Sequence, residues 1–231
     1  MKIIKIIFGI LFKIILWFFI LSIGFTLIYR FVPVPITPLM VIRLYEQAID
    51  EKKELRLYKD WVSIKKISKH VPQAVVAAED QNFMDHRGFD WKAMEKAWEQ
   101  NKKGKRIKGA STISQQTAKN VFLWPSRTLV RKGLEAYFTF LIETFWPKER
   151  IMEVYLNVIE MGEGVYGIEA ASQSNFRKSA EKLNRQEAAL IAAVLPNPRR
   201  WSPARPTPYI QGRQVWILGQ MNNLKPVGMG I

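Results

Sequence analysis

Cysteine is absent from the 231-residue sequence. Its absence excludes disulfides, thiolate metal ligands and a cysteine nucleophile, and it is compatible with an oxidising compartment. Two histidines in the whole chain exclude a histidine-rich metal site. The HExxH, GxSxG and Rossmann fingerprints and the Walker glycine-lysine spacing are also missing. The sequence therefore lacks the motifs of zinc proteases, serine hydrolases, dinucleotide enzymes and P-loop NTPases.

Acidic residues are few beside the basic ones, 20 Asp and Glu against 35 Lys and Arg, for a formal net charge of +15. Such a balance indicates an anionic partner. Nucleic acid, an anionic lipid surface and a diphosphate-bearing substrate would each qualify, and a basic solvated surface explains the charge equally well. The basic residues are scattered and form no recognition-helix pattern, so we expect no nucleic-acid partner.

One long apolar run stands near the N-terminus. Residues 6–29 are apolar except for Lys13, and a run of this length spans the ~30 Å hydrocarbon core of a bilayer. Lys13 can snorkel to the nearer interface. We therefore expect residues 1–30 to be a transmembrane anchor. A cleaved signal peptide is the alternative, but the run is too long and no A-x-A-type cleavage site follows it.

Lysines crowd the N-terminal side of this run, at positions 2, 5 and 13. The positive-inside rule then keeps the N-terminus cytoplasmic and places residues 31–231 on the other side of the membrane. Arg30 at the far end weakens this asymmetry. The predicted orientation therefore rests on a modest charge difference.

Residues 31–50 are predicted to be a linker and juxtamembrane segment, and residues 51–231 a catalytic domain. Three prolines between positions 33 and 38 favour an extended chain, and a helical pattern follows. Strand alternation is scarce, so we expect a mainly α class. The expected helices cover residues 39–49, 72–78, 91–100, 113–122, 129–145, 147–159, 169–174, 185–195 and 209–224.

The first cluster that could carry chemistry follows the apolar run at 74–78. Glu79 and Asp80 are adjacent carboxylates, and Phe83 comes three residues later. A half-buried carboxylate at a helix end has a raised pKa that suits proton transfer, and Phe83 could form a wall of the site. A solvated helix C-terminus is the alternative. Acidic residues there oppose the helix dipole, and this unfavourable placement favours a functional role.

The second cluster covers residues 108–120. Glycine followed by Ser111 and Thr112 begins a helix well, and the free N–H groups of such a helix start can bind an anion or a sugar hydroxyl. Gln115 and Gln116 carry amides suited to sugars. A capped amphipathic helix without a ligand explains the segment equally well.

The third cluster comprises one carboxylate and four cations, namely Glu135 with Lys119, Arg127, Arg131 and Lys132. Arg131 and Glu135 are spaced i, i+4 and share one helix face. Because the rest of that helix is apolar, we expect Glu135 to lie in a cleft where the cations clamp phosphate. A surface ion pair is the alternative. If Glu79 shares this cleft, the two carboxylates suggest glycosidic chemistry.

Five motifs, in order, resemble those of the family 51 glycosyltransferases, the peptidoglycan polymerases. They are Glu79-Asp80-x-x-Phe83-x-x-His86-x-Gly88, Gly109-Ala110-Ser111-Thr112-Ile113-Ser114-Gln115-Gln116, Arg131-Lys132-x-x-Glu135, residues 148–157 and residues 188–203. The second departs conservatively from the usual Gly-Gly-Ser-Thr-Ile-Thr-Gln-Gln, at Ala110 and Ser114. Since the sequence ends shortly after the fifth motif, we expect the monofunctional form without a transpeptidase domain.

The resemblance implies a lysozyme-like α-helical catalytic domain that polymerises lipid II. Glu79 would be the base that deprotonates the acceptor's GlcNAc 4-hydroxyl. That oxygen would attack C1 of the donor MurNAc, displace undecaprenyl diphosphate and form a β-1,4 bond with inversion. Glu135, the second catalytic residue, would sit by the donor and orient the basic groups. The residues implied to bind substrate and diphosphate are Asp80, Phe83, Ser111, Gln115, Gln116, Lys119, Asn120, Arg127, Arg131 and Lys132.

The resemblance also implies a role in cell wall biogenesis and cell shape. Its expected partners are lipid II, the nascent glycan strand, inner-membrane lipids and other cell wall synthesis or division proteins. The anchor would place the domain on the periplasmic side of the bacterial inner membrane. No cofactor would be required, although a divalent cation, Mg²⁺ or Mn²⁺, could stimulate diphosphate binding. Apolar residues between Trp124 and Phe145 would either pack in the core or dip into the membrane.

Two other functions remain open at this stage. A lytic enzyme of the lysozyme-like class needs one catalytic acid and little positive charge, so the basic second and third clusters favour synthesis over cleavage. A non-catalytic anchored scaffold of the wall-assembly machinery would not require Glu79.

Overall fold

The computed structural model describes residues 2–51, 54–102 and 111–229. Helices dominate these residues, which confirms the predicted mainly α class, and each predicted helix is present within a few residues of its expected bounds. They are α1 (Lys2–Tyr29), α2 (Pro38–Ala48), α3 (His70–Glu79), α4 (Trp91–Lys102), α5 (Ile113–Phe122), α6 (Leu129–Phe145), α7 (Lys148–Val158), α8 (Ile168–Phe176), α9 (Arg185–Val194) and α10 (Pro208–Asn223), with short 3₁₀ helices η1 (Ile64–Lys66) and η2 (Ala180–Lys182).

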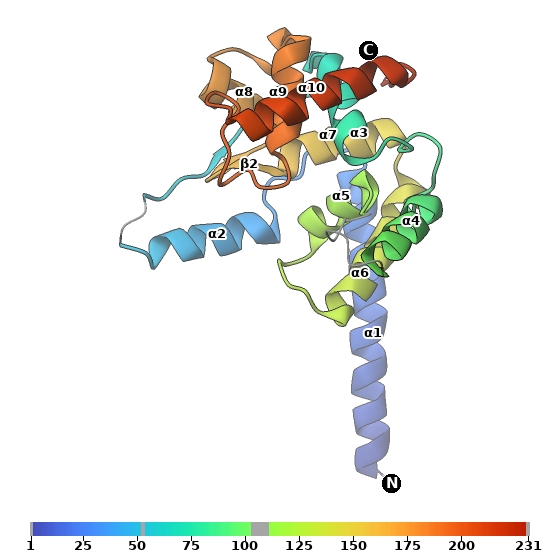
Figure 1. The fold of residues 1–231 in the computed structure, drawn as a ribbon. Helices are drawn as coiled ribbons and strands as arrows, with labels where there is room; N and C mark the ends of the chain where they lie inside the picture. Colours follow the sequence, from blue (N-terminus) through green and yellow to red (C-terminus); the bar gives the residue numbers. More distant parts are fainter. Residues whose placement is uncertain (1, 52–53, 103–110, 230–231) are drawn as a thin grey trace.

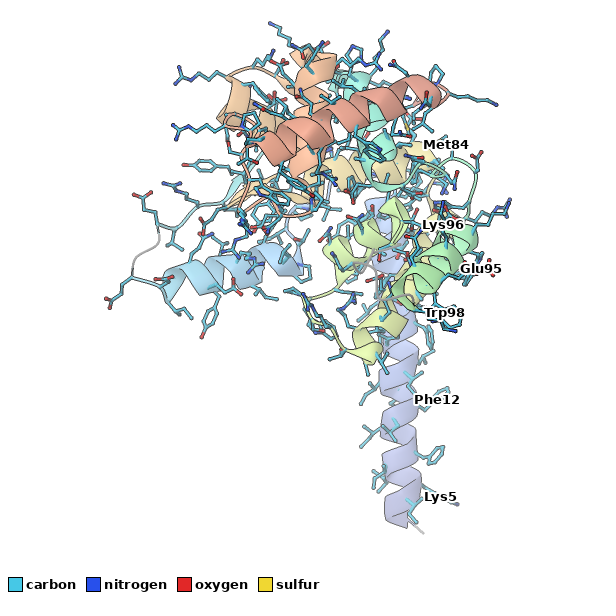
Figure 2. The ribbon with its side chains drawn as sticks, viewed as in Figure 1. Lys5, Phe12, Met84, Glu95, Lys96 and Trp98 are labelled. Carbon is cyan, nitrogen blue, oxygen red and sulfur yellow. The ribbon has the colours of Figure 1, made fainter. Side chains whose placement is uncertain are left out.

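Helix α1 is long and apolar enough to cross a membrane, and no other helix within the described residues is. Its span, Ile4–Tyr29, has a mean hydropathy of 2.7. It extends away from the rest of the chain, with the N-terminus at its far end (Figure 1). Side chains along its free length, among them Lys5 and Phe12, are exposed (Figure 2). These properties suit a single membrane anchor.

The last turns of α1 pack against the domain. Ser22 Oγ and Tyr137 OH share a hydrogen bond of 2.7 Å. Trp146 Nε1 donates to the carbonyl oxygen of Thr26, also at 2.7 Å, and the Phe18 and Tyr137 ring centroids are 5.5 Å apart. The anchor is therefore held to the domain by side chains on and just after α6, as well as by the chain that connects them.

The segment that follows the anchor contributes to the core. Pro38 occupies the first turn of α2, where its missing N–H costs nothing, and Thr37 Oγ1 accepts the Met40 N–H as the cap. Val34 and Met40 are fully buried in the main apolar cluster. Residues 31–50 are thus more than a spacer, and the domain boundary at position 51 stays a prediction.

Two groups of packed helices enclose the core. Helices α3, α9 and α10 contact one another, and α5 packs on both α6 and α7. Fully buried alanines let α3 and α9 approach closely, among them Ala74, Ala77, Ala189 and Ala192. The end of α3 lies beside the start of α5, so residues at these two positions meet between the groups.

A small sheet that the sequence did not predict completes the fold. Strands β1 (Tyr58–Lys59), β2 (Glu160–Gly162) and β3 (Val165–Tyr166) have the order β1-β3-β2, with β1 parallel and β2 antiparallel to β3. Strands this short cannot display an alternating pattern. Gly167 follows β3 at φ 83°, where a Cβ would lie 2.8 Å from a backbone oxygen, so glycine is required there.

Candidate active site

Glu79 is the last residue of α3 and is partly buried. The side-chain amide of Gln116, on α5, donates a hydrogen bond to it, with Nε2 and Oε2 2.9 Å apart. Burial raises the pKa of the Glu79 carboxyl, while the hydrogen bond from Gln116 and the charges of Arg213 and Lys119 limit the rise. A carboxylate that is partly desolvated yet held ionisable is suited to accept a proton near neutral pH.

Asp80 caps α3, and its carboxylate lies at the start of the next motif. Oδ2 accepts the Ile113 N–H at 2.9 Å, so the negative charge lies at the N-terminus of α5, where the helix dipole favours it. His86 Nε2 lies 3.0 Å from both carboxylate oxygens. Because His86 Nδ1 accepts the Gly88 N–H, the neutral ring carries its proton on Nε2 and donates it to Asp80. Asp80 thereby ties the first motif to the second.

Phe83 is fully buried beneath the site. Lys148 Nζ lies 4.5 Å from the centre of its ring and 2.7 Å from Glu143 Oε1, an oxygen that also accepts a hydrogen bond from Ser114. This network joins the second and fourth motifs. Phe83 therefore supports the site from the core side, and direct substrate contact stays a prediction.

A capping box begins α5. Thr112 Oγ1 accepts the Gln115 N–H at 3.1 Å, and Gln115 Oε1 accepts the Thr112 N–H at 3.0 Å. Gln115 is only 2% exposed, so its side chain is engaged in the cap, and its predicted role in sugar binding stays a prediction. Ser111 is exposed. Positions 108–110 of the predicted cluster lie outside the described residues.

Glu135 is buried on α6, as the sequence predicts, and the expected i, i+4 pair is present. Arg131 Nη1 lies 2.5 Å from Glu135 Oε2, and Lys132 Nζ pairs with the other carboxylate oxygen. Arg131 Nε also donates to the carbonyl oxygen of Ser126 at 2.6 Å. Glu135 thus fixes the position of two cations at the start of α6.

Lys119 connects the two carboxylates. Burial lowers the pKa of its ammonium group, the charges of Arg131 and Lys132 lower it further, and Glu135 and Glu79 oppose the change. Lys119 is therefore close enough to both carboxylates to interact with each. Glu79 is hydrogen-bonded to Gln116 on α5, and Glu135 lies on α6, which packs against α5, an arrangement that the sequence could not reveal.

Two pockets open at this site. The first, of about 490 Å³, surrounds Glu79 and includes Asp80, Ser111 and the α4 residues Lys92, Lys96 and Gln100. The second, of about 440 Å³, combines cations with an apolar wall; its lining is Leu39, Arg43, Lys119, Asn120, Leu123, Trp124, Pro125, Ser126, Arg127 and Arg131. Within the described residues, no group of three or more Asp, Glu and His side chains is placed to hold a metal ion. Carboxylates and lysines thus line the first pocket, whereas cations and apolar side chains line the second.

A family model described as Transglycosylase matches residues 46–222, well over half of the sequence. The chain belongs to the transglycosylase family. Proteins named biosynthetic peptidoglycan transglycosylase are similar to it: that of Bdellovibrio bacteriovorus is 61% identical over 209 residues, covering 90% of this chain and 83% of that protein. Those of Bacteroides thetaiotaomicron (54% identical; 91% and 84% covered) and Pseudomonas aeruginosa (49%; 91% and 90%) are further examples.

The transglycosylase domain is lysozyme-like, so the predicted fold is confirmed along with the resemblance. Several residues that lie at this candidate site were nevertheless not singled out by the sequence analysis. Tyr155 is buried, and its hydroxyl donates to Gln116 Oε1 at 3.4 Å. Because Tyr155 belongs to the fourth motif, residues 148–157, the sequence could have indicated it. Lys92 and Lys96 are spaced i, i+4 on α4, which could have predicted a shared face (Lys96 is labelled in Figure 2). For Arg43, no comparable signal was present.

Proposed function

We propose that this chain is a peptidoglycan glycosyltransferase that polymerises lipid II into β-1,4-linked glycan strands and releases undecaprenyl diphosphate. One observation carries the proposal: helix α5 holds the partly buried Glu79 carboxylate through Gln116 and, one turn later, contributes Lys119 to a cation-lined pocket. The names of the similar proteins support the same activity.

The proposed reaction is a direct displacement. Glu79 accepts the proton of the acceptor's GlcNAc 4-hydroxyl, and that oxygen forms a bond with C1 of the donor MurNAc. The bond between C1 and the diphosphate oxygen breaks, and the diphosphate leaves with the electron pair. Lys119, Arg127 and Arg131 stabilise the charge that develops on the leaving group. Attack from the opposite face converts the α-linked donor into a β-linked product without a covalent enzyme intermediate.

Glu135 has a positioning role in this scheme. Its two oxygens hold Arg131 and Lys132 in place at the start of α6, so the cations meet the diphosphate without reorganising. No metal is needed for this arrangement, and we propose that a divalent cation only stimulates diphosphate binding. A lytic enzyme would use Glu79 as an acid and has no diphosphate to bind, so the cation-lined pocket favours the synthetic direction.

The membrane arrangement is part of the proposal. The N-terminus would be cytoplasmic, and the domain would lie on the periplasmic face of the inner membrane. Side chains at the start of α6 support contact with lipid, because Leu129 is 91% and Val130 71% exposed, and Trp124 is also exposed. These side chains are not core residues, which favours the membrane-dipping alternative for this short stretch. Contacts with other cell wall proteins belong to the same proposal.

The deciding experiment combines purified full-length protein with lipid II, for the wild type and Glu79→Gln. Glycan strands should form with the wild type only, and isolated cell wall should not be digested by either. Digestion of wall without polymerisation would support a lytic enzyme instead, and neither activity in the wild type would support a non-catalytic scaffold. Full polymerisation by Glu79→Gln would overturn the assignment of Glu79 as the base. A periplasm-dependent reporter fused to the C-terminus tests the orientation.

A further inference from the structure

Helix α2 supplies residues to the basic pocket although it lies largely before the matched family region. That region begins at residue 46, whereas Leu39 and Arg43 both line the pocket. They are spaced i, i+4 and so share one face of α2. Helix α2, which lies within the predicted linker and juxtamembrane segment, therefore forms one wall of the pocket.

Arg43 lines the pocket with its side chain 23% exposed, while two carboxylates lie beside its guanidinium. Its Nη1 lies 2.5 Å from Glu46 Oε2, and its Nε is 3.7 Å from Glu160 Oε2. Nε is buried and has no hydrogen-bond partner among the described residues. Glu46, the closer partner, is itself 44% exposed, so a ligand in the pocket can compete with it for the guanidinium.

Helix α2 is fixed at both ends, so this wall is already in place. Thr37 caps its start, and the buried Gln47 near its end accepts the Arg56 N–H at 2.7 Å. Met40, between Leu39 and Arg43, is fully buried in the core. A wall that needs no ordering on binding loses little free energy when a ligand arrives.

The chemistry of the lining fits one class of ligand. Arg43, Lys119, Arg127 and Arg131 supply cations, whereas Leu39 and Trp124 supply apolar surface. A diphosphate carries at least two negative charges, so several of these cations can contact it at once. A prenyl diphosphate presents this combination of an anionic group and an adjoining hydrocarbon chain.

We propose that Arg43 is a further binding residue for the diphosphate of the lipid-linked substrate, and that Leu39, one turn earlier, packs against the first isoprene units. This inference rests on the proposed function. It assigns α2, rather than only the five motifs, to substrate binding.

The test measures binding of two probes, farnesyl diphosphate and inorganic diphosphate, to the full-length protein in detergent. Arg43→Gln should weaken both about tenfold, as expected for loss of a charged donor, and Arg43→Lys should recover part of the affinity. Leu39→Ala should weaken farnesyl diphosphate only. Arg56→Gln removes the same charge from an exposed side chain outside the pocket and should change neither affinity.

Glu46→Gln provides a test that does not remove Arg43. Glu46 is half exposed and competes for the guanidinium, so its neutralisation should tighten diphosphate binding two- to threefold, about 0.5 kcal/mol. Unchanged binding in both Arg43→Gln and Glu46→Gln, with thermal unfolding like the wild type, would overturn the inference. Wild-type polymerisation of lipid II in the same preparation separates this outcome from a failure of the proposed function.

Polymerisation kinetics give a second readout. Arg43→Gln should raise the KM for lipid II more than it lowers kcat, because Arg43 binds the diphosphate in both the ground state and the transition state. A drop in kcat alone, with the affinity for both probes unchanged, would contradict the assignment.

Discussion

The side-chain amide of Gln116 donates a hydrogen bond of 2.9 Å to the carboxylate of Glu79, and its oxygen accepts a hydrogen bond from the hydroxyl of Tyr155. Because an ionised carboxylate only accepts hydrogen bonds, Glu79 fixes which way the amide faces, and the buried Tyr155 hydroxyl can donate to the amide oxygen. The amide therefore presents its NH₂ group to Glu79, which stabilises the ionised carboxylate against the cost of burial.

This relationship predicts how the pH dependence of catalysis should change. Burial raises the pKa of Glu79, so kcat/KM of the wild type should rise with pH along a limb above the ordinary carboxyl range. Gln116→Leu removes the donor that favours the charged form, which should move this limb to higher pH and lower the rate at pH 7 about tenfold. Initial rates of lipid II polymerisation across pH measure both effects. A limb that stays in place would contradict the tuning role of Gln116.

Replacement of Glu79 should separate activity from stability. Glu79→Gln should lower kcat by about 10³-fold because the base is lost. It should also raise the melting temperature at pH 7. The folded-state pKa lies above the unfolded one, so the ionised carboxyl penalises folding as pH rises through the folded value. Below the unfolded pKa, near 4.5, the penalty and the advantage of the variant should both vanish.

Thermal unfolding of the wild type, Glu79→Gln and the exposed-site control Glu95→Gln measures this difference at several pH values. Each kcal/mol corresponds to about 2–4 °C for a chain of this size. Glu95 is an exposed carboxylate on α4, so its replacement should leave the melting temperature unchanged. A Glu79→Gln protein less stable than the wild type at pH 7 would contradict the inferred desolvation.

Glu135 provides the third prediction. It is 3% exposed and pairs with Arg131 and Lys132. Glu135→Gln leaves a buried cation without its partner, which should lower the free energy of unfolding by about 3 kcal/mol. Glu135 also keeps Lys119 protonated, so the alkaline limb of activity should move to lower pH in the variant.

Urea unfolding and the pH profile of polymerisation test these two effects separately. Lys132→Met is the matched comparison, because Lys132 is 45% exposed and its removal should cost well under half as much stability. Equal destabilisation by the two variants would show that the pair does not behave as a buried one.

Much of this site follows from local sequence rules. The Arg131 and Glu135 pair follows from i, i+4 spacing, and the end of α3 at Glu79 was visible from its apolar run. The role of Gln115 was not anticipated, because Thr112-x-x-Gln115 is a capping box as well as part of a motif. The capping signature predicts a side chain engaged at the helix start, which the structure shows, whereas sugar contact by Gln115 stays a prediction.

Long-range contacts could not be predicted in this way. The Asp80 carboxylate accepts a hydrogen bond from an N–H 33 residues later. The sequence does not show that the start of α5, which supplies this N–H, lies beside the end of α3. Arg43 reaches the pocket from α2, within residues 31–50, which the sequence predicts to be a linker and juxtamembrane segment. Strands of two or three residues, such as Val165–Tyr166, carry no period to detect.

The junction between anchor and domain makes a fourth prediction. Arg150 donates to the carbonyl oxygens of Tyr29 at 2.8 and 3.0 Å and of Val32 at 2.6 Å, at the C-terminal end of α1. These carbonyls lack helix partners and attract a cation. Arg150→Met should loosen the junction and speed chymotrypsin cleavage at the exposed Phe31. Arg56→Met is the control, and equal cleavage of all three proteins would contradict the role of Arg150.

The last prediction concerns divalent cations. Lys119, Arg127 and Arg131 line the basic pocket, and such fixed charges can neutralise a leaving diphosphate without a metal. Chelation with EDTA should therefore slow polymerisation no more than a few-fold, whereas Lys119→Met should lose about 10²-fold activity with or without added Mg²⁺. Complete loss of wild-type activity in EDTA, restored by Mg²⁺ or Mn²⁺, would show that a bound cation rather than these side chains carries the charge of the leaving group.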